Sequence, residues 1–348
     1  MLLTTKNFTG SIDGKPIHLY QLSNKNGIST TITNYGAKIV SLLVADKEGH
    51  FDDIVAGYDT LFEYINGNKY FGAFIGRYAN RIAKGKFQIG EKQYSLTTNN
   101  NHDHIHGGFK NFGDIVWNVK EENNKLVLSY LSKDGEEGYP GNLSVQCSFY
   151  VTEENELHIL MEAETDAQTI INLTHHSFFN LKGHTAETIL DHQLKINADN
   201  FLPVNNDVIP TGKLSAVENT PFDFKTFHSI GERIYKSDEQ LKIGKGYDHC
   251  FALNGKDGML KLAATLREST SGRAMDIYTN APGIQLYTGN WLDGSDKGKE
   301  GRQYHQRSMI CLEPQDFPDA PNHPNFPNVI LNPGEKYQHH IIYKFYIQ

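Results

Sequence analysis

The amino-acid sequence predicts an all-β protein, a large antiparallel β-sandwich with few short helices. Three features of its 348 residues favour this fold. Apolar residues alternate with polar ones along most of the chain, turn-forming clusters separate the alternating stretches, and helical periodicity is scarce. Residues two apart in a strand project to the same side, so each alternating stretch can bury one face and expose the other to water.

The alternation is clearest in four stretches, whose apolar faces are expected to lie in the core. These faces comprise Leu126, Leu128 and Tyr130; Leu143, Val145, Cys147, Phe149 and Val151; Leu157, Ile159, Met161 and Ala163; and Tyr337, His339, Ile341, Tyr343, Phe345 and Ile347. Turn formers gather at Asn66–Asn68, Lys133–Gly135 and Asn254–Gly258, and Asp59–Asn66 is expected to form one or two helical turns. Because no linker, repeat or low-complexity tract divides the chain, residues 1–348 are predicted to form one domain of two sheets packed face to face.

The composition limits the possible partners. The formal net charge is −8 at pH 7, whereas nucleic acids and anionic membranes favour clustered lysine and arginine. A neutral polar ligand stays open. The segment Met1–Asn7 lacks the apolar core of a signal peptide, and no later stretch approaches the roughly 20 apolar residues that span a bilayer.

The three cysteines, Cys147, Cys250 and Cys311, lie far apart and form no CxxC pair. This spacing indicates three partly buried thiols in a reducing compartment rather than a disulfide framework. We therefore expect a cytoplasmic protein.

The segment Gly76–Ile82, GRYANRI, is the first of four polar segments that could carry chemistry. An arginine beside an asparagine, as in Asn80 and Arg81, offers several fixed donors for the hydroxyl groups of a ligand. The alternative is a pair of surface arginines flanking a strand, which a single short motif favours.

The second segment, Asn101–Gly108, contains three histidines. If it is extended, His102, His104 and His106 point the same way, a pattern compatible with a metal site. A metal also needs a further converging ligand, and the sequence shows none. We expect His102 and His104 to be solvated loop histidines, and His106, at a glycine turn, to be the functional candidate.

The third segment, Asn172–Leu181, contains the adjacent residues His175 and His176. Neighbouring residues of a strand face opposite sides, so only one of the two should face a given pocket. The reference pKa of histidine, about 6.5, allows proton transfer near neutrality. A hydrogen-bonded structural histidine is an equally good interpretation of this segment taken alone.

The fourth segment, Cys311–Asn322, places Glu313 within an apolar strand that leads into a proline-rich loop. Burial of a charge is costly unless the charge is paired or used. A buried ion pair is the alternative to a functional carboxylate. A functional role for Glu313 is favoured over an ion pair, because a proline-rich loop can form the wall of a pocket.

Taken together and in order, these segments resemble the galactose mutarotase (aldose 1-epimerase) family. The matching elements are GRYANRI with the family's GR-x-x-NRI, IHGG at Ile105–Gly108 with LHGG, NLTHHSFFNL at Asn172–Leu181 with NLTNHSYFNL, YDH at Tyr247–His249, GIQLYTGN at Gly283–Asn290, and CLEPQDFPDAPN at Cys311–Asn322. They run from about residue 70 to residue 322. Each match is weak alone, but six in order are strong evidence. At His175 the chain departs from the family, which usually has asparagine there.

The resemblance implies a β-sandwich of the mutarotase type with a sugar bound in an open cleft. It also implies an isomerase that interconverts the α and β anomers of free hexoses, such as galactose and glucose, without a metal or other cofactor. The implied roles are Glu313 as general base, His176 as general acid, His106 as the histidine near the sugar ring oxygen, Arg81 and Asp248 as ligands of sugar hydroxyls, and Asn80 and Gln285 as further pocket residues.

Three other functions stay open at this point. A glycoside hydrolase or lyase would use Asp248 and Glu313 as a carboxylate pair. A sugar-binding module would bind without catalysis. An epimerase of hexose 6-phosphates would need added basic residues, and no such cluster is identifiable. The preferred sugar is also open, and the chain could act as a monomer or a homodimer.

Overall fold

The computed structural model describes residues 3–68, 70–256 and 258–348. The predicted all-β fold is confirmed: in these ranges the chain forms strands β1–β30, and its α-helices are α1 (Leu61–Asn66) and α2 (Glu239–Gly244). Helix α1 falls within the predicted stretch Asp59–Asn66, and the side chain of Thr60 accepts a hydrogen bond from Glu63 N at its start. Neither the helices nor any other helical turn in these ranges is long and apolar enough to cross a bilayer.

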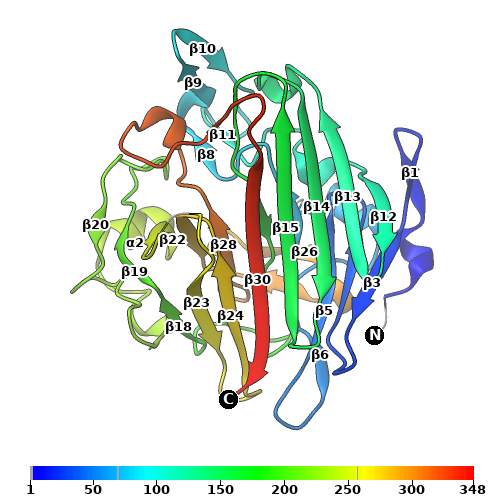
Figure 1. The fold of residues 1–348 in the computed structure, drawn as a ribbon. Helices are drawn as coiled ribbons and strands as arrows, with labels where there is room; N and C mark the ends of the chain where they lie inside the picture. Colours follow the sequence, from blue (N-terminus) through cyan, green and yellow to red (C-terminus); the bar gives the residue numbers. More distant parts are fainter. Residues whose placement is uncertain (1–2, 69, 257) are drawn as a thin grey trace.

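The largest sheet has nine strands, and every pairing in it is antiparallel. In sheet order these are β12 (Asn118–Glu122), β13 (Lys125–Ser132), β14 (Leu143–Val151), β15 (Glu156–Thr165), β30 (Tyr337–Ile347), β24 (Arg273–Thr279), β23 (Lys261–Arg267), β18 (Gln193–Ile196) and β21 (His228–Ser229). Figure 1 shows the C-terminal strand β30, in red, running between β15 and β24. The last strand of the chain thus joins segments from its first and second halves.

The rest of the structure comprises two smaller sheets and several strand pairs. The five-stranded sheet contains β20 (Ser215–Ala216), β19 (Ala198–Phe201), β22 (Asp248–Leu253), β25 (Gly283–Tyr287) and β28 (Cys311–Gln315). The four-stranded sheet contains β3 (Leu19–Ser23), β4 (Ser29–Thr33), β5 (Lys38–Ala45) and β6 (Phe51–Asp53). The pairs are β1 (Gly10–Ile12) with β2 (Lys15–Ile17), β9 (Lys86–Ile89) with β10 (Lys92–Ser95), β8 (Arg81–Ile82) with β11 (His104–Ile105), β16 (Thr169–Ile170) with β29 (Ile330–Leu331), β7 (Ala73–Ile75) with β17 (Thr174–His176), and β26 (Asp293–Lys297) with β27 (Gln303–His305).

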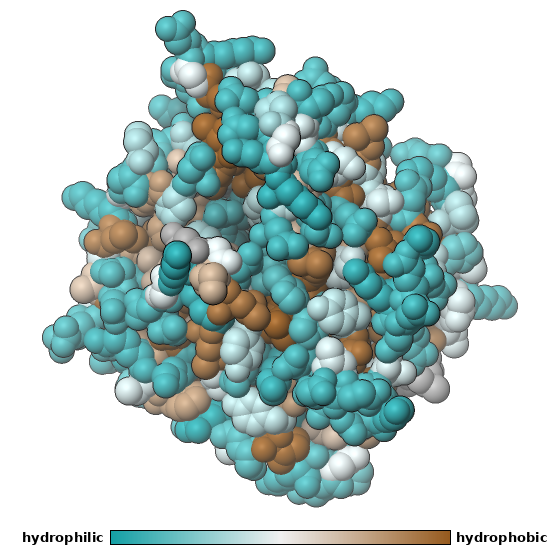
Figure 2. Space-filling view, viewed as in Figure 1, coloured by the Kyte–Doolittle hydropathy of each residue, from teal (hydrophilic) through white to brown (hydrophobic). Residues whose placement is uncertain are grey.

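The main core lies between the nine-stranded sheet and the smaller sheets, because one continuous cluster of buried apolar side chains draws on all three. The predicted core faces of β13, β14 and β15 are confirmed; Leu128, Cys147 and Ile159 are fully buried. On β30 the pattern also holds, except that Ile347, the residue before the chain end, is exposed. The face of the nine-stranded sheet that points away from the core is viewed in Figure 2. It is covered mostly by hydrophilic residues, with apolar residues in scattered groups.

The turn predicted at Lys133–Gly135 is present in the structure. Asp134 and Gly135 form the turn between β13 and the 3₁₀ turn Glu136–Gly138, and Gly135 has φ +82°, a left-handed conformation that glycine adopts without strain. Residue 257, within the predicted turn Asn254–Gly258, lies outside the described residues.

Candidate active site

One cavity of about 960 Å³ brings together all seven residues that the sequence singled out. They are Asn80, Arg81, His106, His176, Asp248, Gln285 and Glu313. Their positions span more than 230 residues of sequence, so strand pairing, and not sequence proximity, assembles the site. We call this cavity the cleft.

The floor of the cleft is one face of the five-stranded sheet. Gln285 on β25 pairs directly with Glu313 on β28, and Asp248 lies on the next strand, β22. The Nε2 atom of Gln285 donates a hydrogen bond of 2.7 Å to Oδ1 of Asp248. Three polar side chains of adjacent strands therefore project together from the sheet, as alternation in each strand requires.

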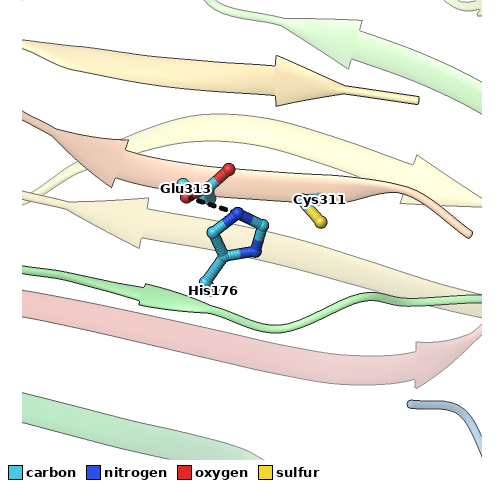
Figure 3. A group of neighbouring side chains, drawn as sticks. All are labelled: His176, Cys311 and Glu313. Atoms are coloured by element: carbon cyan, nitrogen blue, oxygen red, sulfur yellow. Dashed lines mark ion pairs between the residues drawn. The ribbon is translucent and has the colours of Figure 1, made fainter. Parts of the chain in front are cut away.

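His176 and Glu313 face each other across the junction between β17 and β28. The Nε2 atom of His176 lies 3.6 Å from Oε2 of Glu313, and both side chains are more than nine-tenths buried. Figure 3 shows Glu313 and Cys311 projecting from the same strand, with the His176 ring rising toward Glu313 from the neighbouring strand. Oε2 of Glu313 and Nδ1 of His176 have no hydrogen-bond partner among the described residues. The carboxylate and imidazole are thus close enough to act on the same small group.

Burial shifts the pKa of both members of this pair toward the neutral form. Desolvation, and then the nearby charge of Asp248, raise the pKa of Glu313 well above its ordinary value, while Arg81 opposes the shift. Desolvation lowers the pKa of His176 to about 4. Since a carboxylate and an imidazolium at 3.6 Å stabilise each other, their proximity acts against both shifts. Because the two side chains lie 3.6 Å apart, a proton held by this pair can reside on either member.

Aromatic rings fix the orientation of His176. Its ring stacks between Tyr70 and Phe178, with centroid separations of 5.8 and 4.8 Å and interplanar angles of 18° and 20°. The His106 ring meets it edge-on at 5.2 Å. These contacts leave the imidazole little freedom to rotate, so its Nε2 atom is held toward Glu313.

Asn80, Arg81 and His106 line a wall of the cleft, beside its floor. The Nη2 atom of Arg81 lies 3.9 Å from Oδ2 of Asp248. The backbone N–H of Asn80 donates to Nδ1 of His106 at 3.2 Å, and the backbone N–H of His106 donates to Asn80 O at 3.1 Å. Because Nδ1 accepts a hydrogen bond, neutral His106 carries its proton on Nε2.

In two motifs, residues of the same type lie in different environments: one lines the cleft and the other is buried elsewhere. His175 faces the core, where Ser177 Oγ lies 3.0 Å and Ala37 O 3.4 Å from its ring nitrogens. Only His176 lines the cleft, as alternation predicted. The Arg77 guanidinium is fully inside, donating to carbonyl and hydroxyl groups at residues 132, 133, 140 and 141. The alternative of a surface arginine pair is therefore wrong.

The prediction that His104 is a solvated loop histidine is also wrong. His104 is fully buried, and its ring nitrogens lie 2.7 Å from Thr97 O and 2.6 Å from the hydroxyl of Tyr139. His102 is exposed, as expected. His106 turns out of the line of these residues because its φ is +50°, which ends the extended conformation of β11. The three histidines therefore do not converge.

The three thiols are buried more deeply than the sequence indicated. Cys147, Cys250 and Cys311 are all unpaired and buried. Cys311, His176 and Glu313 each place one potential metal-ligand atom within 4.8 Å of the others (Figure 3). Desolvation raises the pKa of the Cys311 thiol well above its ordinary value, so a metal ion would have to displace its proton.

Comparison with known proteins decides the family. The sequence profile of the family described as Aldose 1-epimerase matches residues 18–344, nearly the whole chain. The chain belongs to the aldose 1-epimerase family. It is 40% identical to a galactose mutarotase of Bos taurus over 329 residues, 94% of each chain. It is 34% identical to an aldose 1-epimerase of Escherichia coli K12 over 337 residues, 96% of each chain.

A solved structure of an aldose epimerase homologue from C. elegans superposes with a TM-score of 0.87 at 30% identity, covering 94% of this chain and 98% of that one. The aldose 1-epimerase fold expected from the sequence motifs is thereby confirmed.

The cleft of this aldose 1-epimerase also contains residues that the sequence analysis did not single out as site residues, among them Tyr70, Phe178 and Tyr287. Tyr287 lies two residues after Gln285 on β25, so alternation could have placed it on the same face. Phe178 lies two residues after His176, but β17 ends at His176. Tyr70 precedes β7 in a loop, and no local pattern marks it.

Proposed function

We propose that this chain is an aldose 1-epimerase that interconverts the α and β anomers of free hexoses, with Glu313 and His176 as its acid–base pair. One observation carries the assignment of roles: Glu313 and His176 face each other at 3.6 Å inside a cleft lined by polar groups suited to sugar hydroxyls. Membership of the aldose 1-epimerase family supports the reaction.

The reaction needs one base and one acid at the same carbon. Opening of a cyclic aldose removes a proton from the C1 hydroxyl and adds one to the ring oxygen, as the bond between C1 and the ring oxygen breaks. The Glu313 carboxylate takes the first proton, and His176 as imidazolium gives the second. Rotation about the C1–C2 bond then presents the other face of the aldehyde. Closure reverses both transfers, and each positioned proton transfer typically contributes about 10² to 10⁴ in rate.

The number of protons that Glu313 and His176 hold between them fits this cycle. Burial raises the pKa of Glu313 and lowers that of His176, so it favours the proton on Glu313, whereas the reactive form has the proton on His176. The two forms differ by one proton transfer and by no exchange with solvent. A sugar hydroxyl that donates to Glu313 stabilises its carboxylate and so favours the reactive form.

The other cleft residues bind and orient the sugar. Arg81 supplies donors, while Asp248, held by Gln285, supplies acceptors for hydroxyl groups. The Nε2 atom of His106, whose Nδ1 atom accepts a hydrogen bond from Asn80 N, is suited to donate a hydrogen bond near the ring oxygen. Tyr70 and Phe178 keep the His176 ring in place while the sugar changes shape.

Polarimetry of freshly dissolved α-galactose and α-glucose tests the proposal. Glu313→Gln and His176→Asn should each lower kcat by at least about two orders of magnitude, since each removes one proton-transfer group. His175→Asn is the matched control, because it alters the adjacent imidazole that faces the core, and its kcat should stay close to that of the wild type. A nearly wild-type kcat in either cleft variant would refute that residue's role.

The same samples separate the alternative functions. A glycoside hydrolase would release reducing sugar from a galactoside, and a binding module would bind galactose in calorimetry while mutarotation stayed at the spontaneous rate. Among the described residues lining the cleft, the cationic side chains are Arg81 and Lys245. Arg81 faces Asp248, and Lys245 Nζ lies over the Trp291 ring at 3.8 Å. Because both cationic side chains already have partners, the cleft favours a free hexose over a hexose phosphate. Parallel assays with galactose and galactose 6-phosphate will test this preference.

We also infer that the chain is one domain, as its apolar core joins strands from the three main sheets. A single cooperative unfolding transition would support this inference, and two separate transitions would oppose it.

A further inference from the structure

Arg81 lies in a short strand that is anchored from outside the cleft. Strand β8 has two residues, Arg81 and Ile82, and pairs only briefly with β11. The loop that follows β28 crosses over it, and within this loop Asp319 N donates a hydrogen bond of 2.8 Å to Arg81 O. In addition, Oδ1 of Asp319 accepts a hydrogen bond of 2.9 Å from Ala83 N. One residue thus holds the backbone on both sides of Ile82.

The Asp319 side chain is placed for this task and for no direct contact with a sugar. It is 2% exposed and is not among the residues that line the cleft. Its Oδ1 atom also accepts from Asn322 Nδ2 at 2.6 Å, and its Oδ2 atom lies 3.2 Å from Nε2 of His323. Oδ1 is therefore hydrogen-bonded within its own loop as well as to Ala83 N, which fixes the carboxylate, and Oδ2 lies beside an imidazole.

A second carboxylate acts on the next amide of the same turn. Oδ1 of Asp103 accepts a hydrogen bond of 2.7 Å from Lys84 N. The consecutive N–H groups of Ala83 and Lys84 thus each end on a buried carboxylate, directly after Arg81 and Ile82. Without such acceptors these amides would lose their hydrogen bonds, and the turn that fixes the direction of β8 would be free to shift.

We propose that Asp319 is a positioning residue that holds Arg81 for sugar binding, an inference that rests on the proposed function of the cleft. The loop carrying Asp319 continues from β28, the strand of Glu313. The same loop receives a hydrogen bond of 2.8 Å from the Tyr78 hydroxyl at Phe317 O. Asp319 therefore joins the strand of the general base to the residue that binds hydroxyls, and keeps the two in register.

The test compares Asp319→Gly with Asp319→Asn. Asp319 has φ +57°, a left-handed conformation that both glycine and asparagine tolerate. Glycine removes the acceptor for Ala83 N without backbone strain, whereas asparagine keeps an acceptor oxygen. Asp319→Gly should raise KM and the calorimetric Kd for galactose about tenfold, the effect of roughly one hydrogen bond, with kcat within about twofold of the wild type. Asp319→Asn should restore both constants.

His323→Ala is the matched control, because it removes the imidazole that lies beside Oδ2 of Asp319 but leaves the contact with Ala83 N. It should bind galactose like the wild type. If Asp319→Gly does not fold, Ala83→Pro replaces it, since proline removes the N–H donor of the same hydrogen bond. A wild-type KM in the folded Asp319→Gly or Ala83→Pro variant overturns the inference, and so does a loss of thermal stability without a change in KM.

The failure of the inference is distinct from that of the proposed function. Wild-type protein that binds galactose without accelerating mutarotation would refute the proposed reaction, while the calorimetric Kd of the Asp319 variants would still report on Arg81. Wild-type protein that accelerates mutarotation, together with an unchanged Kd in Asp319→Gly, would refute only the positioning role.

Discussion

Asp248 on β22 receives a hydrogen bond of 2.7 Å from Gln285 on β25 and lies 3.9 Å from the guanidinium of Arg81 on β8. Burial raises the pKa of this carboxyl, while Arg81 and the Gln285 hydrogen bond lower it. The arrangement holds a carboxylate within reach of a ligand without closing it into a tight ion pair. It also links the wall of the cleft to its floor.

Removal of Arg81 should mainly weaken substrate binding. Arg81→Ala is expected to raise KM for galactose about tenfold or more while kcat falls less, because a charged hydrogen bond contributes about 1.5–3 kcal/mol. Asp248→Asn should act in the same direction, and the double variant should cost less than the sum of the two, since the residues share a contact. Initial rates by polarimetry over a range of galactose concentrations measure these effects. An unchanged KM in Arg81→Ala would remove Arg81 from the binding site.

Removal of Arg77, the other arginine of the same motif, should lower stability and not substrate binding. Arg77 makes five hydrogen bonds of 2.7–3.0 Å, four of them buried and the fifth, to Lys133 O, partly buried. Arg77→Ala should lower the free energy of unfolding by about 3 kcal/mol or more, because several buried acceptors lose their partner together. Urea unfolding measures the loss. A stable Arg77→Ala with a raised KM would show that the two arginines had been assigned in reverse.

Buried histidines should make the fold sensitive to acid. Burial lowers the pKa of His175 to about 3, and those of His104 and His339 to about 4. The unfolded chain takes up protons on these residues below pH 6.5 while the folded chain does not, so stability falls as pH falls from about 7 toward 3. Each such histidine accounts for about 2 kcal/mol of the loss between pH 7 and pH 5.

His175→Asn removes one of these protonation sites. The difference in the free energy of unfolding between pH 7 and pH 5, measured by urea titration at both values, should therefore be smaller in this variant than in the wild type by about 2 kcal/mol. An equal difference in the two proteins would mean that His175 takes up its proton in the folded state as well.

Chelation should leave the proposed reaction intact, because neither proton transfer uses a metal. Prolonged dialysis against EDTA is expected to leave kcat for α-galactose unchanged. Cys311→Ser, which alters one of the three potential ligands (His176, Cys311 and Glu313), should behave in the same way toward EDTA. A rate that falls on dialysis and returns with added Zn²⁺ in the wild type but not in Cys311→Ser would assign a metal to this cluster and contradict the mechanism.

Local patterns predicted the strands because burial of one sheet face imposes a period of two on each strand separately. The core faces around Leu128, Cys147 and Ile159 were therefore readable in sequence, as was the rule that His175 and His176 face opposite sides. His104 was misjudged because burial in a short strand depends on what covers it, here Tyr139, 35 residues away. The stack of Tyr70 on His176 and the hold of Asp319 on Ala83 join residues more than 100 positions apart, and no local pattern contains them.

The sequence by itself determined the fold class, because burial of one sheet face imposes a local period of two, and its motifs carried the resemblance that singled out seven of the residues lining the cleft. Only the tertiary structure decided how near the proton-transfer atoms of His176 and Glu313 lie, and that Arg81 reaches Asp248 while Arg77 is buried away from the cleft. Those relations arise when strands distant in the chain pair and pack, and the separation of two side chains in space is a property of that packing.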